Sequence, residues 1–359
     1  VTGCLGSTPE FIRESHPNVM TITGPQKFNE VLDSITDNIP VKSNRFEAKP
    51  SSSYVKLTPR HYSYLKISYG FNHKCSLCII PSLRGSLKSR SMTSIISEAK
   101  NLVERGTKEL LVISQDTSAY GLDLKFKEVS INGKRLKSNI YNLVNELGSL
   151  GVWVRLHYIY PYPHVRKLIP LMNRNYVLPY LDVPFQHAHP DVLKRMARPS
   201  NNVHDLEQIS EWRSVNPDLS IRSTFIVGFP GETESEFNFL LDWLEEAKID
   251  RVGCFKYEDV SGARANLMEN HVKADIIEDR YDRLMRKTQE ISSWKLKEKV
   301  GNTYTCIVDN VETDQLVCRT IFDAPEIDGL VYVPTNQTHH SVGDRLKVKI
   351  NSSSEYDLT

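Results

Sequence analysis

Two cysteines separated by two residues, Cys75 and Cys78, are the side chains whose types and spacing in this sequence most directly suggest chemistry. Thiolates at this spacing can hold a zinc ion, ligate iron in a cluster or form a redox dithiol. A structural zinc site needs two further ligands, but no second Cys-x-x-Cys pair is present, and His73 lies too close to replace one. A redox dithiol favours the first turn of a helix, which the flanking residues do not support. Zinc and dithiol sites stay open as the less supported alternatives.

Six short apolar runs alternate with helix-like patterns through the middle of the chain, and the cysteine pair directly follows the first run. Strands that alternate with helices in this way form a parallel sheet. We therefore expect an α/β fold with a partial (β/α) TIM-like barrel, in which chemistry gathers at the carboxyl ends of the strands. The six runs are YSYLKIS, KELLVIS, VWVRLHYI, VLPYLDVPF, SIRSTFIVG and RVGCFKY.

Helix signals support this alternation. Residues 94–105 place apolar side chains on one face before Gly106, and Thr233 with Glu236 forms a capping box ahead of another apolar stripe. A long amphipathic helix is expected from about 273 to 299. Four short alternating runs follow it, TYTCIVDN, QLVCRTI, GLVYVP and RLKVKI, and predict a small antiparallel β-barrel.

The composition suits a globular protein. The chain has 359 residues, of which 40% are hydrophobic and 25% charged. No apolar run reaches the roughly 18 to 20 residues that a membrane helix needs, and no secretory leader opens the sequence. We therefore expect a cytoplasmic protein without a membrane partner, whose six cysteines are thiols or metal ligands rather than disulfides.

Four regions are expected along the chain. Residues 1–45 form an N-terminal α/β remnant, in which VTGCLG resembles a strand end and turn, and because Val1 is not Met we expect further residues upstream. The polar, Ser- and Pro-containing stretch 46–59 is a linker. Residues 60–297 form the barrel, and 298–359 form the C-terminal domain.

Charge is distributed unevenly although the net charge is +1. Residues 41–90 carry ten lysines or arginines and one acid, whereas residues 301–359 carry four basic residues and nine acids. Two solvated faces would account for this pattern. The alternative is a cationic partner at the C-terminal end.

The cysteine loop, GFNHKCSLCIIPSLRGSLKSR, resembles the cluster-binding loop of radical S-adenosylmethionine (SAM) enzymes and, more narrowly, that of the methylthiotransferases. Further motifs similar to this family occur in order along the chain, namely VTGCLG, LVISQDTSAYG, RLHYIYPYP, LDVPFQHAHPDVLKRMARP, RSTFIVGFPGETE, GCFKYEDVSGARA and APEIDG. The C-terminal domain resembles a TRAM domain.

The resemblance implies a specific chemistry. Three thiolates of a Cys-x-x-x-Cys-x-x-Cys loop hold a [4Fe-4S] cluster whose fourth iron binds SAM, and a second, auxiliary [4Fe-4S] cluster in the N-terminal domain supplies sulfur. The implied reaction adds a methylthio group to the β-carbon of an aspartate in a small-subunit ribosomal protein. A tRNA adenosine methylthiotransferase is the alternative within the family. An electron donor such as flavodoxin or ferredoxin is also implied.

The resemblance also assigns residues. It makes Cys75 and Cys78 catalytic cluster ligands and Cys4 a ligand of the auxiliary cluster. The cofactor-binding residues that it implies lie at strand ends and in the following turns, and they are Gln115, Asp116, Gln186, Arg222 and Gly228. Near the cysteine loop, Arg84 and Arg90 are candidates for pairing with a carboxylate of SAM or of the substrate.

Two positions depart from the family. Phe71 stands where the first cysteine of the loop is expected, four residues before Cys75, and a phenyl ring cannot ligate iron. Tyr69 stands where a small acidic residue is expected. A non-catalytic, ribosome-associated binding protein on the same scaffold is therefore a second functional hypothesis.

Other candidates have ordinary structural explanations. Arg155, His157 and His187 would face the same site if the barrel interpretation is right, although strand histidines more often lie in a satisfied core. Cys254, Cys306 and Cys318 are expected in the core, because they lie within apolar strand patterns. The acidity of the C-terminal domain favours a basic ribosomal protein over RNA as the partner.

Overall fold

The structure is a computed structural model that describes residues 1–25, 27–38, 56, 58–174, 177–198, 202–335 and 339–359. Most of the expected linker, 46–59, lies outside these residues. No helix in the described ranges is both long and apolar enough to cross a bilayer.

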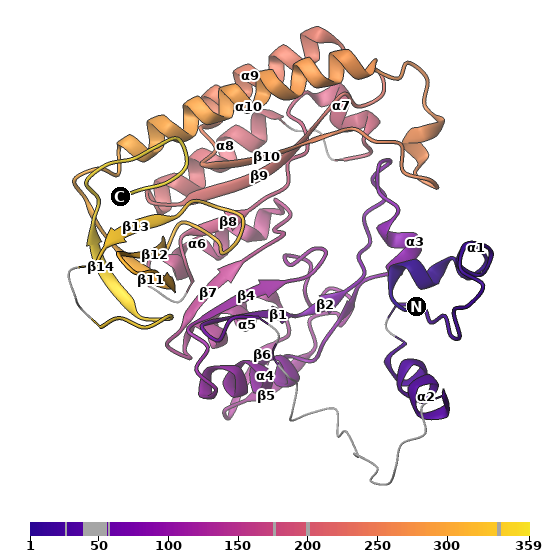
Figure 1. The fold of residues 1–359 in the computed structure, drawn as a ribbon, viewed down its shortest axis with the longest axis horizontal. Helices are drawn as coiled ribbons and strands as arrows, with labels where there is room; N and C mark the ends of the chain where they lie inside the picture. Colours follow the sequence, from indigo (N-terminus) through magenta and orange to yellow (C-terminus); the bar gives the residue numbers. More distant parts are fainter. Residues whose placement is uncertain (26, 39–55, 57, 175–176, 199–201, 336–338) are drawn as a thin grey trace.

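A six-stranded parallel sheet forms the centre of the protein, with the strand order β1-β4-β7-β8-β9-β10 (Figure 1). All six apolar runs form these strands, so the expected partial barrel is confirmed. Their bounds are Tyr62–Lys66 for β1, Glu109–Ile113 for β4, Trp153–Leu156 for β7, Tyr180–Asp182 for β8, Ser220–Val227 for β9 and Arg251–Lys256 for β10.

Helices cover the outer face of the sheet, and α9 and α10 lie side by side over β9 and β10 (Figure 1). The expected capping box starts α9, because Thr233 and Glu236 exchange both hydrogen bonds. Most of the apolar side chains between sheet and helices belong to one continuous core. The helices of the barrel are α3 (Ile80–Arg84), α4 (Met92–Glu104), α5 (Ile140–Gly148), η2 (Pro163–Lys167), α6 (Ile169–Met172), α7 (Pro190–Arg195), α8 (Asn202–Val215), α9 (Glu234–Ala247), η3 (Arg264–Leu267) and α10 (Ala274–Lys297).

Two small antiparallel sheets of two strands each accompany the barrel. One pairs β2 (Ser68–Tyr69) with β3 (Lys88–Ser89), and the other pairs β5 (Glu128–Ile131) with β6 (Lys134–Lys137). The second of these is a hairpin that turns at Asn132 and Gly133, which both have positive φ. An Asn-Gly pair between alternating residues is a strong hairpin signal that the sequence analysis missed.

The C-terminal domain is a four-stranded antiparallel sheet with its own core, as expected. Cys306 and Cys318 are buried in that core, and burial raises the pKa of each thiol to about 12. The strands, ordered β13-β12-β11-β14, are β11 (Thr303–Val311), β12 (Gln315–Thr320), β13 (Val331–Pro334) and β14 (Arg345–Lys349).

A buried network of charges joins this domain to the amino ends of the barrel strands. Glu109, the first residue of β4, accepts hydrogen bonds from Arg155 Nε and Arg319 Nη2, both at 2.7 Å. Arg319 also donates to Asp309 at 2.5 Å, and His61 Nε2 lies 2.7 Å from the same carboxylate. The side chains of Glu109, Arg155 and Arg319 are fully buried. Each charge therefore depends on its partners for stability.

The segment after β12 extends the contact between the domains. Asp323 accepts a hydrogen bond from Arg251 at 2.6 Å, and Asp328 accepts one from the Tyr180 hydroxyl at 2.8 Å and lies 3.5 Å from Arg222 Nε. Asp309 contacts His61, and Glu326 accepts the Tyr62 hydroxyl, so four of the nine C-terminal acids face the barrel. The expectation that this acidity serves a basic partner does not hold for Asp309, Asp323 and Asp328, because arginines balance their charge.

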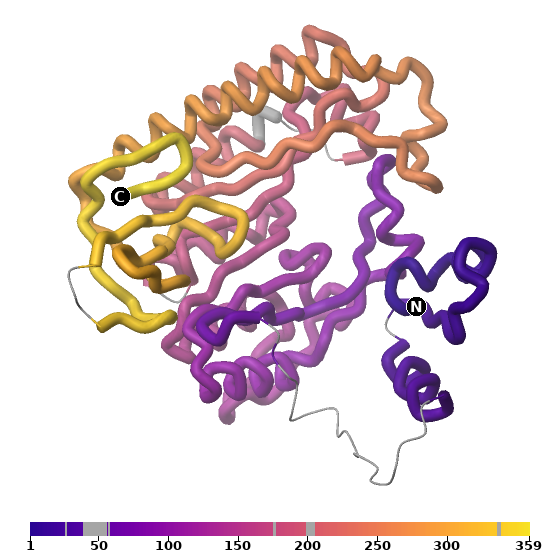
Figure 2. The backbone as a smooth tube through the Cα atoms, in the orientation of Figure 1, coloured from indigo at the N-terminus to yellow at the C-terminus, as the bar shows by residue number. Residues whose placement is uncertain are grey.

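The N-terminal segment lies at the opposite end of the sheet from the C-terminal domain (Figure 2). The expected strand end at VTGCLG is wrong, because Cys4–Ser7 form a 3-10 helix, η1, and the described part of residues 1–38 is helical without strands. Gly6 allows this compact turn, since a Cβ there would meet the Thr23 carbonyl at 2.0 Å. The other helices are α1 (Pro9–Ser15) and α2 (Phe28–Asn38).

Candidate active site

The cysteine loop lies at the carboxyl end of β1, where the barrel fold predicts a site. Cys75 and Cys78 lie in one turn, closed by the N–H of Cys78 donating to the Cys75 carbonyl at 3.2 Å. Cys75 is buried, with Arg198 Nη1 3.8 Å from its sulfur, and the N–H of Ile80 lies 3.4 Å from the Cys78 sulfur. Burial raises the pKa of Cys78, and the Ile80 N–H opposes this shift.

Contacts from two distant segments fix this loop. Ser76 donates from its hydroxyl to the Arg195 carbonyl at 2.8 Å and from its N–H to the Met196 carbonyl at 2.9 Å. Its own carbonyl accepts the N–H of Ala265 at 2.9 Å. The polar groups of Ser76, the first of the two residues between the cysteines, are thus bonded to other protein groups, which holds the loop in place without a ligand.

A second anchor lies on the other side of the loop. His73 Nε2 lies 2.9 Å from Asp116 Oδ2 and 2.9 Å from the Tyr162 hydroxyl, and its ring stacks on Tyr160 with the centroids 4.1 Å apart. Asp116 is buried and also accepts the Ser118 hydroxyl at 2.7 Å. These contacts account for Asp116 as a loop anchor and cap. Its expected role in binding SAM stays a prediction that this geometry does not favour.

Replacing Asp116 by asparagine is expected to loosen the cysteine loop. The amide loses the charge-assisted contacts to His73 and Tyr162, a loss worth about 1 to 3 kcal/mol. Amide hydrogen exchange over residues 70–79 should become about tenfold faster or more, while exchange over β10 stays unchanged. Asp123→Asn, at an exposed aspartate that contacts Ser89, is the matched control. Equal protection in both variants would contradict the anchor.

A pocket of about 440 Å³ opens beside this loop at the carboxyl ends of β1 and β4. Gln115 lines it, and the buried Oε1 of Gln115 has no partner among the described residues. An orphaned acceptor of this kind suits a ligand that brings an N–H or O–H group. The pocket is lined by Lys66, Phe71, Ile80, Arg84, Ile113, Ser114, Gln115 and Tyr158.

The residues present do not complete the cluster site that the resemblance implies. Cys75 and Cys78 supply two thiols, whereas Phe71 occupies the third ligand position and its ring lines the pocket wall. Three thiolates are needed to leave one iron open, so a cubane does not fit this chain as it stands.

Cys4 is the remaining expected ligand. It opens η1, which packs against α3 in the continuation of the cysteine loop (Figure 1). Cys4 is half-buried and lies close enough to Lys66 for its charge to affect the pKa of that lysine. The structure therefore brings the Cys4 segment and the cysteine loop to the same mouth of the barrel.

The turn after β9 is held by a buried carboxylate. Glu232 accepts the N–H of Gly228 at 3.0 Å and an N–H of Arg280 at 2.9 Å, and His187 lies 3.7 Å away. Gly228 has φ +76°, and a Cβ there would meet Ile277 Cγ1 at 2.4 Å. The turn and its packing thus explain the glycine, and its role in cofactor binding stays a prediction.

Glu232 and His187 are expected to give opposing pH dependences of stability. Burial raises the pKa of Glu232 from 4.5 to about 7, so its contribution to the free energy of unfolding falls between these pH values. Burial lowers the pKa of His187 from 6.5 to about 3, so its contribution rises with pH over that window. Urea unfolding of Glu232→Gln should therefore show stability increasing from pH 4 to 6 more steeply than in the unchanged chain. His187→Gln should show the reverse, and parallel profiles would contradict the assignment.

Two other expected cofactor residues lie on β9 or pair with it. Arg222 is the third residue of β9 rather than its end, and its guanidinium faces Asp328 of the C-terminal domain. This ion pair explains the arginine without a cofactor. Gln186 has φ +71° and its backbone pairs with Phe225 and neighbouring residues of β9. Binding of a cofactor by Arg222 or Gln186 stays a prediction.

The residues expected to share one face have different polar partners. Arg155 lies in the contact with the C-terminal domain, His157 Nδ1 lies 3.4 Å from Asp182, and His187 is buried beside Glu232. Arg155 and His157 nevertheless share a face, because the Arg155 guanidinium and the His157 ring both lie against the Tyr180 ring. The expected common face is therefore found for these two residues, whereas His187 has separate neighbours.

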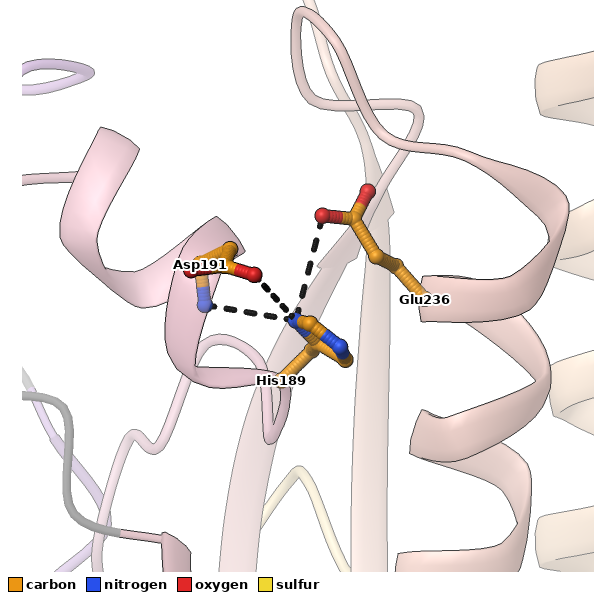
Figure 3. A group of neighbouring side chains, drawn as sticks. All are labelled: His189, Asp191 and Glu236. Atoms are coloured by element: carbon orange, nitrogen blue, oxygen red, sulfur yellow. Dashed lines mark hydrogen bonds and ion pairs between the residues drawn. The ribbon is translucent and has the colours of Figure 1, made fainter.

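Among the described residues, one group of three potential ligands has atoms close enough for a metal ion, and Figure 3 shows it: His189, Asp191 and Glu236. His189 Nδ1 accepts the N–H of Asp191 at 3.2 Å, which caps α7. Glu236 accepts bonds from Arg195 at 2.9 Å and from the N–H of Thr233 at 2.7 Å. Because these lone pairs are in use, the group is a pair of helix caps rather than a metal site.

The sequence analysis missed Lys66. This residue ends β1 and lines the 440 Å³ pocket, with its ammonium 4.3 Å from the centroid of the Tyr69 ring. Its signal was a cation at the end of the strand before the cysteine loop, which is where a barrel places functional groups. Of the two expected arginines, Arg84 lines the same pocket, whereas Arg90 pairs with Glu98 at 2.6 Å.

Comparison with known proteins places this site in a family. The radical SAM superfamily pattern matches residues 65–244, and the TRAM domain pattern matches residues 300–359. The chain is 56% identical to a protein of Paracoccus denitrificans named ribosomal protein uS12 methylthiotransferase RimO, over the whole of this chain and 78% of that protein. A protein of the same name from Roseobacter denitrificans is 54% identical over the whole chain and 77% of its length.

Solved structures are more distant. The chain resembles the cobalamin-dependent SAM radical enzyme OxsB at a TM-score of 0.48, with 10% identity over 81% of this chain and 44% of OxsB. It resembles coproporphyrinogen III oxidase (HemN) from Escherichia coli, a radical SAM enzyme, at a TM-score of 0.45, with 14% identity over 65% of this chain and 53% of HemN. From the full-length similarity and the two domain patterns, the chain belongs to the radical SAM superfamily and, within it, to the RimO family of methylthiotransferases.

Proposed function

We propose that the scaffold of this chain recognises ribosomal protein uS12 and serves the addition of a methylthio group to the β-carbon of an aspartate in that protein. The observation that carries the proposal is the similarity over the whole chain to proteins named for uS12 methylthiolation. The family consists of transferases that use SAM and [4Fe-4S] clusters. The cysteine loop at the mouth of the barrel is the position that such chemistry requires.

Described residues of this chain would position the cysteine loop and the neighbouring pocket for this function. The contacts of Ser76 and His73 hold the cysteine loop, and the Glu232 carboxylate fixes the turn after β9. Gln115 offers a buried acceptor in the pocket beside the loop. Aromatic and apolar side chains limit water there, as radical chemistry needs.

Phe71 favours a second candidate function. With two thiolates in place of three, the chain would bind uS12 without modifying it. Both candidates share the uS12 partner and differ in the methylthio product. An electron donor of the flavodoxin or ferredoxin class belongs to the first candidate only.

Both candidate functions require binding of uS12. Measuring the binding of the purified chain to uS12 and to tRNA tests this requirement. We expect fluorescence anisotropy to give a lower Kd for labelled uS12 than for labelled tRNA at the same ionic strength, because the excess of acids in residues 301–359 disfavours a phosphate backbone. Tighter binding of tRNA would contradict the proposed substrate. Mass spectrometry of uS12 after anaerobic incubation with SAM and reductant then separates the two candidates.

A further inference from the structure

Lys66 and Arg84 form an unusual pair at the mouth of the barrel. Both line the 440 Å³ pocket, Lys66 from the end of β1 and Arg84 from the end of α3. Among the described residues, neither has an ion-pair partner, and no aspartate or glutamate lines the pocket. Two cations therefore face one cavity without an anion to balance them.

The surroundings make this arrangement costly unless an anion binds. Lys66 is half-buried, and burial lowers its pKa, as does the nearby Arg84, while the charge of Cys4 acts in the opposite direction. Phe71, Ile80 and Ile113 supply an apolar wall to the same pocket. Away from bulk water, the attraction of two cations to an anion is stronger than at an exposed surface.

The position of the pocket limits what the anion can be. The pocket touches the cysteine loop through Phe71, and the Cys4 segment packs against α3, which contributes Ile80 and Arg84 to the pocket. In the proposed function, the target aspartate must reach this mouth of the barrel, where the cysteine loop lies. In the target aspartate, the carboxylate is bonded directly to the β-carbon that reacts. Partners that bind this carboxylate would therefore fix the position of the β-carbon.

We propose that Lys66 and Arg84 bind the carboxylate of the target aspartate of uS12 and thereby hold its β-carbon at the mouth of the barrel. This assignment rests on the proposed function. A guanidinium can hold a carboxylate through two parallel hydrogen bonds, and the Lys66 ammonium supplies a further donor from the end of β1. The clamp also gives specificity, because an asparagine or a neutral side chain would leave both cations unbalanced.

The carboxylate of SAM has the same chemistry and is the other source that the pocket could accept. A double-mutant cycle separates the two sources, with anisotropy of labelled uS12 and the full-length chain as the measurement. The protein variants are Lys66→Gln and Arg84→Gln, and the uS12 variant replaces the target aspartate by asparagine. Lys88→Gln and Arg135→Gln are matched controls, since both side chains are exposed and lie outside the pocket.

We expect Lys66→Gln and Arg84→Gln each to raise the Kd for uS12 by about tenfold or more, and the controls to change it by less than about twofold. Against the asparagine form of uS12, the same two variants should cause little further loss. An excess of unlabelled SAM should not displace uS12.

Four outcomes would overturn the assignment. If Lys66→Gln and Arg84→Gln leave uS12 binding unchanged, the clamp is wrong while the proposed function stands. If they weaken both forms of uS12 equally, or if SAM displaces uS12 in a Lys66-dependent manner, the cations hold another group. If the unchanged chain does not bind uS12, the proposed function fails and the clamp fails with it.

Discussion

Replacing Phe71 by cysteine is expected to raise the iron bound after anaerobic reconstitution to about four atoms per chain, the content of one cubane. The unchanged chain should retain much less, because two thiolates bind a cluster loosely. The rest of the loop is in place, since contacts of Ser76 and His73 hold it without a metal. Iron and acid-labile sulfide analysis, together with the absorption spectrum of the reconstituted protein, measure the change.

Two matched variants give this experiment its controls. Phe71→Ala removes the ring without adding a ligand, so it separates relief of bulk from ligation. Cys4→Ser, introduced into every variant, removes the remaining thiol of the expected auxiliary site. Equal iron content in the alanine and cysteine variants, or a full complement in the unchanged chain, would show that residue 71 does not decide cluster binding.

Glu109→Gln is expected to lower the free energy of unfolding by about 3 to 5 kcal/mol, because it leaves Arg155 and Arg319 buried with too little negative charge. Burial alone would raise the pKa of Glu109, but the two arginines hold it below its usual value. Its contribution is therefore present at neutral pH and lost as the pH falls through the lowered pKa. Urea unfolding followed by circular dichroism at neutral and acidic pH measures both effects.

Glu104→Gln is the control for this prediction, since Glu104 is exposed near the end of α4 and should change stability by less than about 0.5 kcal/mol. A loss for Glu109→Gln that is no larger than that of the control would contradict the buried network. A loss that persists unchanged at acidic pH would contradict its electrostatic origin.

Local patterns predicted the elements of the barrel well. Each of the six strands is a short apolar run, and the capping box of Thr233 and Glu236 marks the start of α9. These signals depend only on residues that are close in sequence, so they can be recognised without knowledge of the fold. The cysteine loop was placed correctly for the same reason, since it directly follows the first strand.

Long-range pairing was not predictable in this way. Arg319 and Glu109 are 210 residues apart, and no residue pattern near either one predicts that they pair. Counting acids in residues 301–359 therefore treated interface carboxylates as surface charge. Asp116 illustrates the same limit, because its partners His73 and Tyr162 come from two other loops.

The site itself was only partly predictable. Gln115 was expected from the family resemblance; the structure places its unpartnered acceptor in the pocket, and its role in cofactor binding stays a prediction. Lys66 was overlooked because one lysine in an alternating strand looks like an ordinary solvent-facing residue. Only the structure shows that it shares a cavity with Arg84.

The charged contact between barrel and C-terminal domain has a consequence for protein engineering. A chimera that takes its last sixty or so residues from a relative inherits Arg319 and Asp309 from one parent, and Glu109 and Arg155 from the other. Unless the four side chains match, the junction encloses an uncompensated charge. Exchanges that move all four positions as a set should yield folded hybrids, and exchanges that split a mismatched set should yield insoluble ones.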